Sequence, residues 1–428
     1  MEYSNLANTL QIKFNQKVNK FGSQFSRPEQ KFLKDMTYGI LNTGSCIVRQ
    51  IAQSLNAKTS LKKVCERLTD HLSKQSLNKK LSDSIVIDQS RKIKDNGLII
   101  IDPSDIVKEY AKSSEGLCKV HDASKNETKN GYHLLNIVGY NQSDNANEVI
   151  PLVSEIHSSG YDEDTFKNRL LFSLIDLIIH TNNRATMVFD RGFDDKIIYT
   201  FHYENESAFI IRAKKNRNLF VDSQLKNIHE IAKNVELSDL YKENKKTLMA
   251  GFIDVKIPVA PYPRKKNPTH VNAQLVVARI KSDNGKIGGL FYFLCGNLRE
   301  RFPLKNEFLT YVLKSYRARW KIEEYHRQIK QDFCWEDIKL QNYQRIKTMN
   351  TILHFAMTFV YEQIRLKDFF ILEAPALMLD KNKLSSLPKF IYYRISKVVN
   401  TIFKHLSIRK PQPIFSRKKY EQMMIPLF

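Results

Sequence analysis

The sequence contains few cysteines, glycines and prolines, and it has no long apolar run. The five cysteines are scattered without a C-x2-C pair, so neither a zinc knuckle nor a disulfide framework is indicated, and a reducing compartment is expected. Only 14 Gly and 13 Pro occur in 428 residues, which argues against a fibrous or low-complexity chain. No run approaches the roughly 18 apolar residues of a membrane-spanning helix, and the polar start, MEYSNLANTLQ, has no signal-peptide core. We therefore expect a globular cytoplasmic protein without a membrane partner.

Positive charge is abundant. The chain has 68 Lys and Arg against 45 Asp and Glu, a formal net charge of +23. Because Lys and Arg neutralise phosphates and release counterions, this excess favours a nucleic-acid partner, although a basic membrane-surface protein would share it. The apolar fraction of 42% is enough for a large core, and the length suits two to four domains of about 100 to 200 residues each.

The first 90 residues have the apolar spacing of amphipathic helices. The stretch IAQSLNAKTSLKKVCERL (51–68) is typical of two short helices around a turn, as in a helix-turn-helix. Residues 1–95 hold 17 basic and 8 acidic side chains, a net of +9. The charge favours a DNA-binding domain, while a solvated helical bundle would show nearly the same pattern.

From residue 97 the pattern changes to short apolar runs typical of strands. These runs are LIIID (98–102), GLCKVHD (116–122), GYHLLNIVGYN (131–141) and EVIPLV (148–153). An apolar helical stretch begins at Phe166, and a further strand, TMVFD, ends at Asp190. Strands, a helix and another strand, with Asp102 and Asp190 where the first and last strands are expected to end, predict an α/β, RNase H-like fold.

The 132 residues between Asp190 and Glu323 are too many for one connection inside a compact sheet. They contain further strand-like runs and predict an inserted β subdomain. The tail after residue 361 is basic, with 13 Lys and Arg against 5 Asp and Glu, a net of +8. We therefore expect four parts: a helical, helix-turn-helix-like domain (1–90), an RNase H-like core (91–205 and 300–365), an inserted β subdomain (206–299) and a basic helical C-terminal region (366–428).

The spacing Y-x2-R-x3-E-x6-K places one carboxylate among three side chains suited to phosphate. On a helix that turns about 100° per residue, the four positions fall within roughly a 60° arc. They are Tyr316, Arg319, Glu323 and Lys330. An ordinary solvated face, with Glu323 paired to Arg319 and Arg327, is the alternative interpretation.

Phosphodiester chemistry with two metal ions needs hard oxygen ligands that converge from separate elements, the ions lying about 3.5 to 4 Å apart. Asp102 and Asp190 each follow an apolar β-type run, and with a helical Glu323 they form a set in the order that the fold requires. A single Asp after a strand is more often a turn former or a helix cap. Asp88, in SIVIDQS, is a rival for the first carboxylate, but we place it in the connection from the N-terminal domain.

Four blocks of the sequence resemble the DDE transposases of bacterial insertion sequences, in the YREK-signature group that includes the Tn-five transposase. They are LIIIDPSDIVKEYA (98–111), VFDRGF (188–193), FIIRAKKNR (209–217) and YRARWKIEEYHRQIK (316–330). The resemblance covers about residues 30 to 365, and four blocks in order are far more specific than D-R-G-F alone.

This resemblance implies a function and a set of site residues. Asp102, Asp190 and Glu323 would form a metal-binding triad for Mg²⁺, with Mn²⁺ as a substitute, and the DNA contacts would come from Tyr316, Arg319, Lys330 and Arg212. The expected activity is cut-and-paste transposition of double-stranded DNA by a homodimer in a bacterial cytoplasm, associated with the nucleoid. A nuclease on the same fold without strand transfer, and a catalytically silent DNA-binding derivative, are the alternatives.

The chain departs from some relatives in its tryptophans. Those relatives stack a flipped base on a Trp of the inserted subdomain, whereas Trp320 and Trp335 here lie outside it. Trp320 is expected to be a packing residue. The candidates for stacking would be Phe291, Tyr292 and Phe293.

Overall fold

The computed structural model describes residues 3–122, 125–142, 147–243, 245–259, 270–366 and 390–408. Its N-terminal part is helical, as expected, with α1 (Tyr3–Gly22), α2 (Arg27–Thr43), α3 (Val48–Ser54), α4 (Leu61–Leu72) and α5 (Gln75–Ser90). Local sequence fixes the ends of α2. The Glu29 carboxylate accepts a hydrogen bond from the Ser26 backbone N–H at 3.0 Å, and Gly44 ends the helix with a φ of 62°.

Helices α3 and α4 follow one another around the turn at 55–60, as the helix-turn-helix prediction requires. Val64, Leu68 and Leu72 form the buried stripe of α4, while Lys62 and Lys63 lie on its exposed side. The amphipathic pattern therefore fixes which side of α4 faces solvent.

The central sheet contains both antiparallel and parallel strand pairs. Its strands and the helix between them are β1 (Leu98–Val107), β2 (Cys118–Asp122), β3 (Glu127–Asn141), β4 (Glu148–His157), α6 (Phe166–Thr181), β5 (Thr186–Phe189) and β6 (Ala208–Arg212). The order is β4-β3-β1-β5-β6, antiparallel from β4 to β1 and parallel from β1 to β6. All four residues of β5 are buried, as in a parallel strand covered on both faces. This mixed α/β architecture is consistent with the expected fold.

One expectation about the first strand is wrong. Asp102 does not lie at the end of β1, because the strand runs on to Val107 in antiparallel pairing with β3. Only the parallel pairing with β5 stops earlier, at Ile101 and Phe189. Gly131 permits the extension, since a Cβ there would lie 2.1 Å from the Ile106 carbonyl oxygen.

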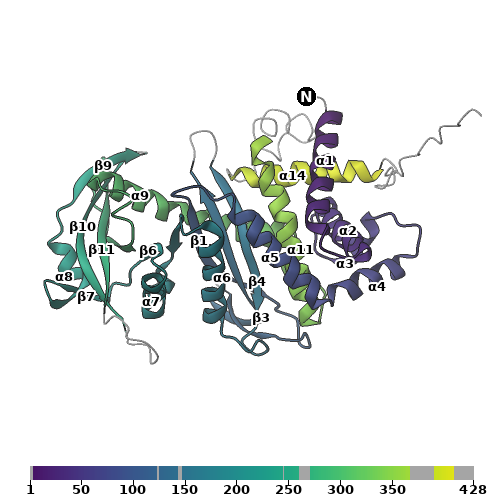
Figure 1. Ribbon diagram of the computed structural model, residues 1–428, viewed down its shortest axis with the longest axis horizontal. Coiled ribbons are helices and arrows are strands. Elements are labelled where there is room, and N and C mark those ends of the chain that lie inside the picture. Colours follow the sequence, from purple (N-terminus) through teal and green to yellow (C-terminus); the bar gives the residue numbers. More distant parts are fainter. Residues whose placement is uncertain are drawn as a thin grey trace, which may run out of the picture.

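The region 206–299 continues the same sheet. It contains β6, β7 (Asn218–Val221), β8 (Gln224–Asn227), α8 (Ile228–Lys233), β9 (Ser238–Glu243), β10 (Lys246–Pro258), β11 (His270–Ser282) and β12 (Phe291–Gly296), and α7 (Lys196–Glu204) precedes it. Strand β6 pairs in parallel with β5 and antiparallel with β12, so hydrogen bonding is continuous across the expected boundary at residues 205 and 206. Figure 1 shows β7 to β11 at one end of the molecule and the N-terminal helices at the other.

Four α-helices follow β12 in the described part of the chain. They are α9 (Lys305–Ala318), α10 (Trp320–Asp332), α11 (Tyr343–Glu362) and α14 (Ile391–Ile408), with the short 3₁₀ turns η2 (Trp335–Asp337) and η3 (Gln363–Leu366) between them. A third such turn, η1 (Arg191–Phe193), lies earlier in the chain, between β5 and α7. Helix α14 lies within the expected C-terminal region, and residues 367–389 and 409–428 lie outside the described residues. Within the described part, no helix is long and apolar enough to cross a membrane.

The expectation of a single helix from Tyr316 to Lys330 is also wrong. Helix α9 ends at Ala318, and α10 begins at Trp320. At the junction the Arg319 N–H bonds to the Tyr316 carbonyl and the Ile322 N–H bonds to the Arg319 carbonyl, both at 3.1 Å and three residues apart. This tighter spacing interrupts the α-helical ladder at the signature arginine.

Candidate active site

The sheet register brings Asp102 and Asp190 together. The last parallel pair of β1 and β5 joins Ile101 to Phe189, and each aspartate is the next residue on its strand. Because parallel strands run in the same direction, consecutive residues remain neighbours past the last pair. Two carboxylates from separate stretches of chain therefore lie at one point of the sheet.

Helices α9 and α10 complete the cluster from above these strands. The Tyr316 hydroxyl donates to Asp190 Oδ1 at 2.8 Å. Arg319 donates through Nη1 to Asp102 Oδ2 at 2.9 Å and through Nη2 to Glu323 Oε1 at 2.5 Å. One guanidinium thus bridges two of the three acidic residues. We call Asp102, Asp190 and Glu323 the acidic triad.

The pKa values of the two aspartates are shifted in opposite directions. Burial raises the pKa of Asp102 to about 6, against the lowering effect of Arg319, and the charges of Asp190 and Glu323 add to the rise. Burial also opposes ionisation of Asp190, but hydrogen bonds from the Arg191 backbone N–H and the Tyr316 hydroxyl bring its pKa below the usual value. Asp190 is therefore the more firmly ionised of the pair.

A family model described as the transposase DDE domain matches residues 93–359. This span is more than half of the chain, and it begins just before β1 and ends near the end of α11. The chain belongs to the DDE transposase family. No curated protein matches it. Membership implies DNA cleavage and joining related to transposition, with divalent metal ions of the kind that this family uses.

The transposase has a ligand set whose chemistry suits such ions. Carboxylate oxygens are the ligands that Mg²⁺ and Mn²⁺ prefer. Among the described residues, however, no group of three or more His, Cys, Asp or Glu side chains is arranged to hold a metal ion. Arg319 lies between Asp102 and Glu323, and the Glu323 side chain is 53% exposed. The carboxylate oxygens of the acidic triad are thus of the right type for a divalent ion, and in this structure those of Asp102 and Glu323 are arranged around the Arg319 guanidinium.

Arg212 lies beside this cluster. It ends β6, and its guanidinium carbon is 5.7 Å from the centre of the Phe291 ring. Its charge lowers the pKa of Asp190, and its side chain opposes the rise in the pKa of Tyr316. The structure thus brings Arg212 together with Tyr316 and Arg319.

Lys330 occupies a different position. Its ammonium donates to the Asp105 carbonyl oxygen at 2.6 Å and lies 3.3 Å from the Glu336 carboxylate. These contacts connect α10 to β1 and η2, so the fourth signature residue does not join the contacts around the acidic triad.

The aromatic residues of β12 face in two directions. Phe291 and Phe293 line a cavity of about 380 Å³ together with Arg212 and Tyr316. Tyr292 alternates to the other face, is only 2% exposed, and shares a 2.7 Å hydrogen bond with His229. Tyr292 was therefore wrong as a stacking candidate.

The two tryptophans lie in unlike surroundings. Trp335 is fully buried. Trp320 is 43% exposed, with the Lys321 ammonium 4.0 Å from its ring centre and the Phe390 ring 6.1 Å away. Trp320 thus packs on one side only.

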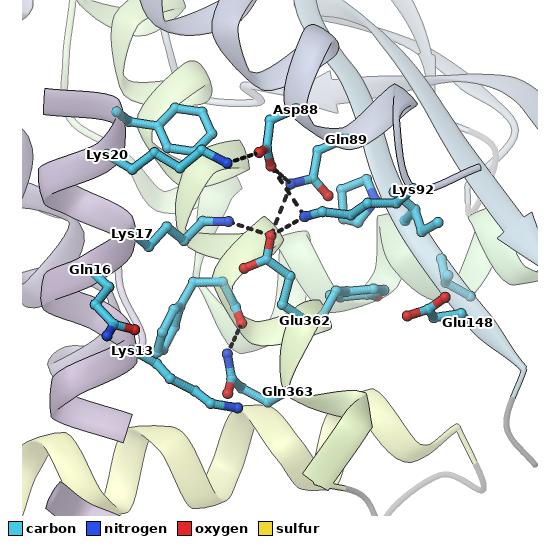
Figure 2. Close-up of a pocket in the computed structure, with 16 residues that line it drawn as sticks. Lys13, Gln16, Lys17, Lys20, Asp88, Gln89, Lys92, Glu148, Glu362 and Gln363 are labelled. Atoms are coloured by element: carbon cyan, nitrogen blue, oxygen red, sulfur yellow. Dashed lines mark hydrogen bonds and ion pairs between the residues drawn. The ribbon is translucent and has the colours of Figure 1, made fainter. Parts of the chain in front are cut away.

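Asp88 belongs to another cluster, shown in Figure 2. It lies in the last turns of α5, where it pairs with Lys20 at 2.6 Å and with Lys92 at 3.2 Å. Glu362, at the end of α11, accepts hydrogen bonds from Lys17 and Lys92. Asp88 therefore serves an ion-pair network that joins helices. Sequence reasoning missed this network, because its members lie up to 345 residues apart.

Proposed function

We propose that this chain is a cut-and-paste transposase of a bacterial insertion sequence, within the YREK group. It would bind the terminal inverted repeats, hydrolyse a DNA strand at each end and join the freed 3′-OH to target DNA. The observation that supports this best is the convergence of Asp102 and Asp190 with Tyr316 and Arg319, since these residues come from β1, β5 and the α9–α10 junction.

The chain's own groups would divide the work. Asp102, Asp190 and Glu323 would hold the divalent ions, which supply Lewis acidity to the attacking and leaving oxygens. Arg212 and Arg319 would hold the phosphate of the strand being cut, because a planar guanidinium fork matches phosphate oxygens. Tyr316 would keep Asp190 oriented and ionised. Lys330 would reach DNA only by giving up its contacts to Asp105 and Glu336.

The four parts expected from the sequence would have separate roles. Residues 1–90 would bind the transposon ends through α3 and α4, and the basic C-terminal region would contact DNA or a second subunit. Because β6 extends the parallel order of β1 and β5, we assign it to the catalytic core and the insert to β7–β12. The protein would act in the cytoplasm at the nucleoid. It would work as a homodimer on paired ends, and a competent complex with one protomer, found by sizing, would refute that state.

The test uses isosteric variants of the acidic triad. Short inverted repeats flanking the gene would supply the substrate. Asp102→Asn, Asp190→Asn and Glu323→Gln should each lose Mg²⁺-dependent strand cleavage and joining while still binding end DNA. Asp88→Asn is the matched control, because this carboxylate pairs with Lys20 and Lys92 away from the triad. Full activity in any triad variant would overturn the assignment.

The nuclease alternative predicts a different result with precut ends. A transposase should join a precut 3′-OH to a second DNA, whereas a nuclease should cleave without joining. A silent derivative should do neither and still bind DNA.

A further inference from the structure

Arg319 is held in a manner unusual for a side chain that is meant to contact DNA. Its side chain is only 17% exposed, and its two terminal nitrogens are bonded to two different carboxylates, those of Asp102 and Glu323. A guanidinium has five donors in a fixed plane, and these bonds use one donor on each terminal nitrogen and fix the direction of the other three. In this state Arg319 is committed to the acidic triad.

The same two carboxylates are needed by the metal ions. A divalent cation and a guanidinium that share an oxygen are like charges at short range, which is unfavourable in a partly buried site. Glu323 is turned toward Arg319, and no described group of three acidic, His or Cys side chains is closed around a metal position. In this arrangement the Arg319 guanidinium, rather than a metal ion, supplies positive charge to the acidic triad.

We propose that Arg319 is a positioning residue that leaves the acidic triad and binds a DNA phosphate when metal binds. We call this exchange of partners the handover. Without metal, its guanidinium holds Asp102 and Glu323 and neutralises part of their charge. When the divalent ions arrive, the carboxylates turn to them, and the freed Arg319 takes a DNA phosphate. This proposal rests on the proposed function. It adds that metal and Arg319 exclude one another at the triad, so that metal loading strengthens the hold on DNA.

The alternative role for Arg319 predicts the opposite sign. A hydrogen-bonding partner that only orients metal ligands lowers metal affinity by about 10- to 100-fold when removed. A residue that competes with the metal raises the affinity when removed. The direction of the change therefore separates competition from orientation.

The experiment measures Mn²⁺ binding to the full-length, DNA-free protein by electron paramagnetic resonance of free Mn²⁺. Arg319→Ala should lower the Kd by about tenfold relative to the unmodified chain, which corresponds to about 1.4 kcal/mol. Arg319→Lys keeps the charge without the two-pronged geometry, and its Kd should fall between the two. Arg317→Ala is the matched control, because it removes one positive charge only two residues from Arg319. The Arg317 guanidinium is paired with Glu243 and not with the acidic triad. Its Kd should change by less than about threefold.

A second measurement protects the test from misfolding. Circular dichroism should be unchanged in Arg319→Ala, and saturating Mn²⁺ should raise its Tm more than that of the unmodified chain, since binding to the folded state alone stabilises it. An Arg319→Ala variant that binds Mn²⁺ equally well or more weakly overturns the handover.

One further variant separates this idea from the proposed function. Asp190→Asn should greatly weaken Mn²⁺ binding, in the presence or absence of Arg319. If Asp190→Asn leaves Mn²⁺ binding unchanged, the triad is not the metal site and the proposed function fails with the handover. If Asp190→Asn abolishes binding while Arg319→Ala does not tighten it, only the handover is overturned.

Discussion

Tyr316 joins helix α9 to strand β5 through a single hydrogen bond to Asp190. Burial, together with the negative charge of Asp190, raises the pKa of Tyr316 above its usual value, so the phenol stays protonated and donates. The bond in turn lowers the pKa of Asp190. A side chain that resembles a DNA contact in the sequence therefore also favours the ionised form of Asp190.

Replacing this hydroxyl should reduce activity without unfolding the protein. Tyr316→Phe loses the hydrogen bond to a charged partner, worth about 1.5 to 3 kcal/mol, so strand cleavage should slow by about tenfold or more. Phe keeps the ring contact with Phe293, whose centre lies 4.7 Å away, so the Tm should change little. Cleavage rates at saturating Mg²⁺ test this.

Tyr311→Phe is the control for the same helix. Its hydroxyl donates to Thr186 Oγ1 at 2.8 Å, on β5 but away from the triad. This variant should lower stability and leave the cleavage rate of the folded protein nearly unchanged. Equal losses of rate in the two variants would contradict a specific role for Tyr316.

At the scale of elements, the ion-pair network in Figure 2 fastens α1 to the core. Lys17 and Lys92 both donate to Glu362, so α1, the segment before β1 and the end of α11 meet at one carboxylate. Lys17 is 8% exposed and Glu362 is 30% exposed. The Lys17 ammonium is largely shielded from water, and a charge in that position needs its partner.

The network should respond unequally to loss of its two kinds of member. Glu362→Gln leaves Lys17 and Lys92 close together without their shared carboxylate, and should lower the free energy of unfolding by about 3 kcal/mol. Lys17→Met should cost less, because Glu362 keeps Lys92 as a partner and the methionine remains apolar. Urea unfolding of both variants measures the difference.

A surface pair provides the comparison. Lys79 lies 3.1 Å from Asp83 with its side chain 78% exposed, so Lys79→Met should change the free energy of unfolding by less than about 1 kcal/mol. A larger loss from Lys17→Met than from Glu362→Gln would show that Lys92 does not support Glu362 in the way the contacts suggest.

Much of the element order could be predicted from the sequence, because apolar runs and the amphipathic pattern are local signals. The signature spacing likewise selected Tyr316, Arg319 and Glu323, and the structure places all three at one cluster. The prediction that β1 ends at Asp102 failed, since its extension depends on pairing with Gly131 and its neighbours far along the chain. No local pattern contains that information.

The contacts that individual side chains make could not be predicted from the sequence either. The break between α9 and α10 at Arg319 is not marked in the sequence by a Pro or a Gly. The bond of Lys330 to Asp105 depends on a strand more than 200 residues away. Motif spacing identifies which residues belong to a site, whereas their partners in the free protein come from the tertiary fold.

At the scale of the whole molecule, the described residues form two apolar clusters that cover opposite faces of the sheet. One joins the N-terminal helices, α9 to α11 and α14 to the sheet. The other lies under α6, α7 and α8. Each cluster encloses a histidine: His354 in the first region and His202 beside Phe209 in the second, exposed by 3% and 0%.

These two histidines predict how stability depends on pH. Burial lowers the pKa of His202 to about 3 and that of His354 to about 4, from 6.5. The unfolded chain therefore binds more protons below pH 6.5, and the free energy of unfolding falls as the pH falls. Each histidine contributes about 1.4 kcal/mol per pH unit, or about 2 kcal/mol by pH 5. Stability should thus decline before most carboxylates titrate.

Substitution separates this effect from the other titrating groups. Urea unfolding at pH 7, 6 and 5 should show a shallower pH dependence in His202→Gln and in His354→Gln, each by about 1.4 kcal/mol per unit below pH 6.5. The double variant should lose both contributions, because sites without shared partners add. His354 shares a hydrogen bond with the Tyr325 hydroxyl and His202 shares one with the Ser207 hydroxyl, so both variants should also be less stable at pH 7. If the pH dependence is the same in all four proteins, these histidines have the same pKa in the folded and the unfolded chain, and the acid sensitivity arises elsewhere.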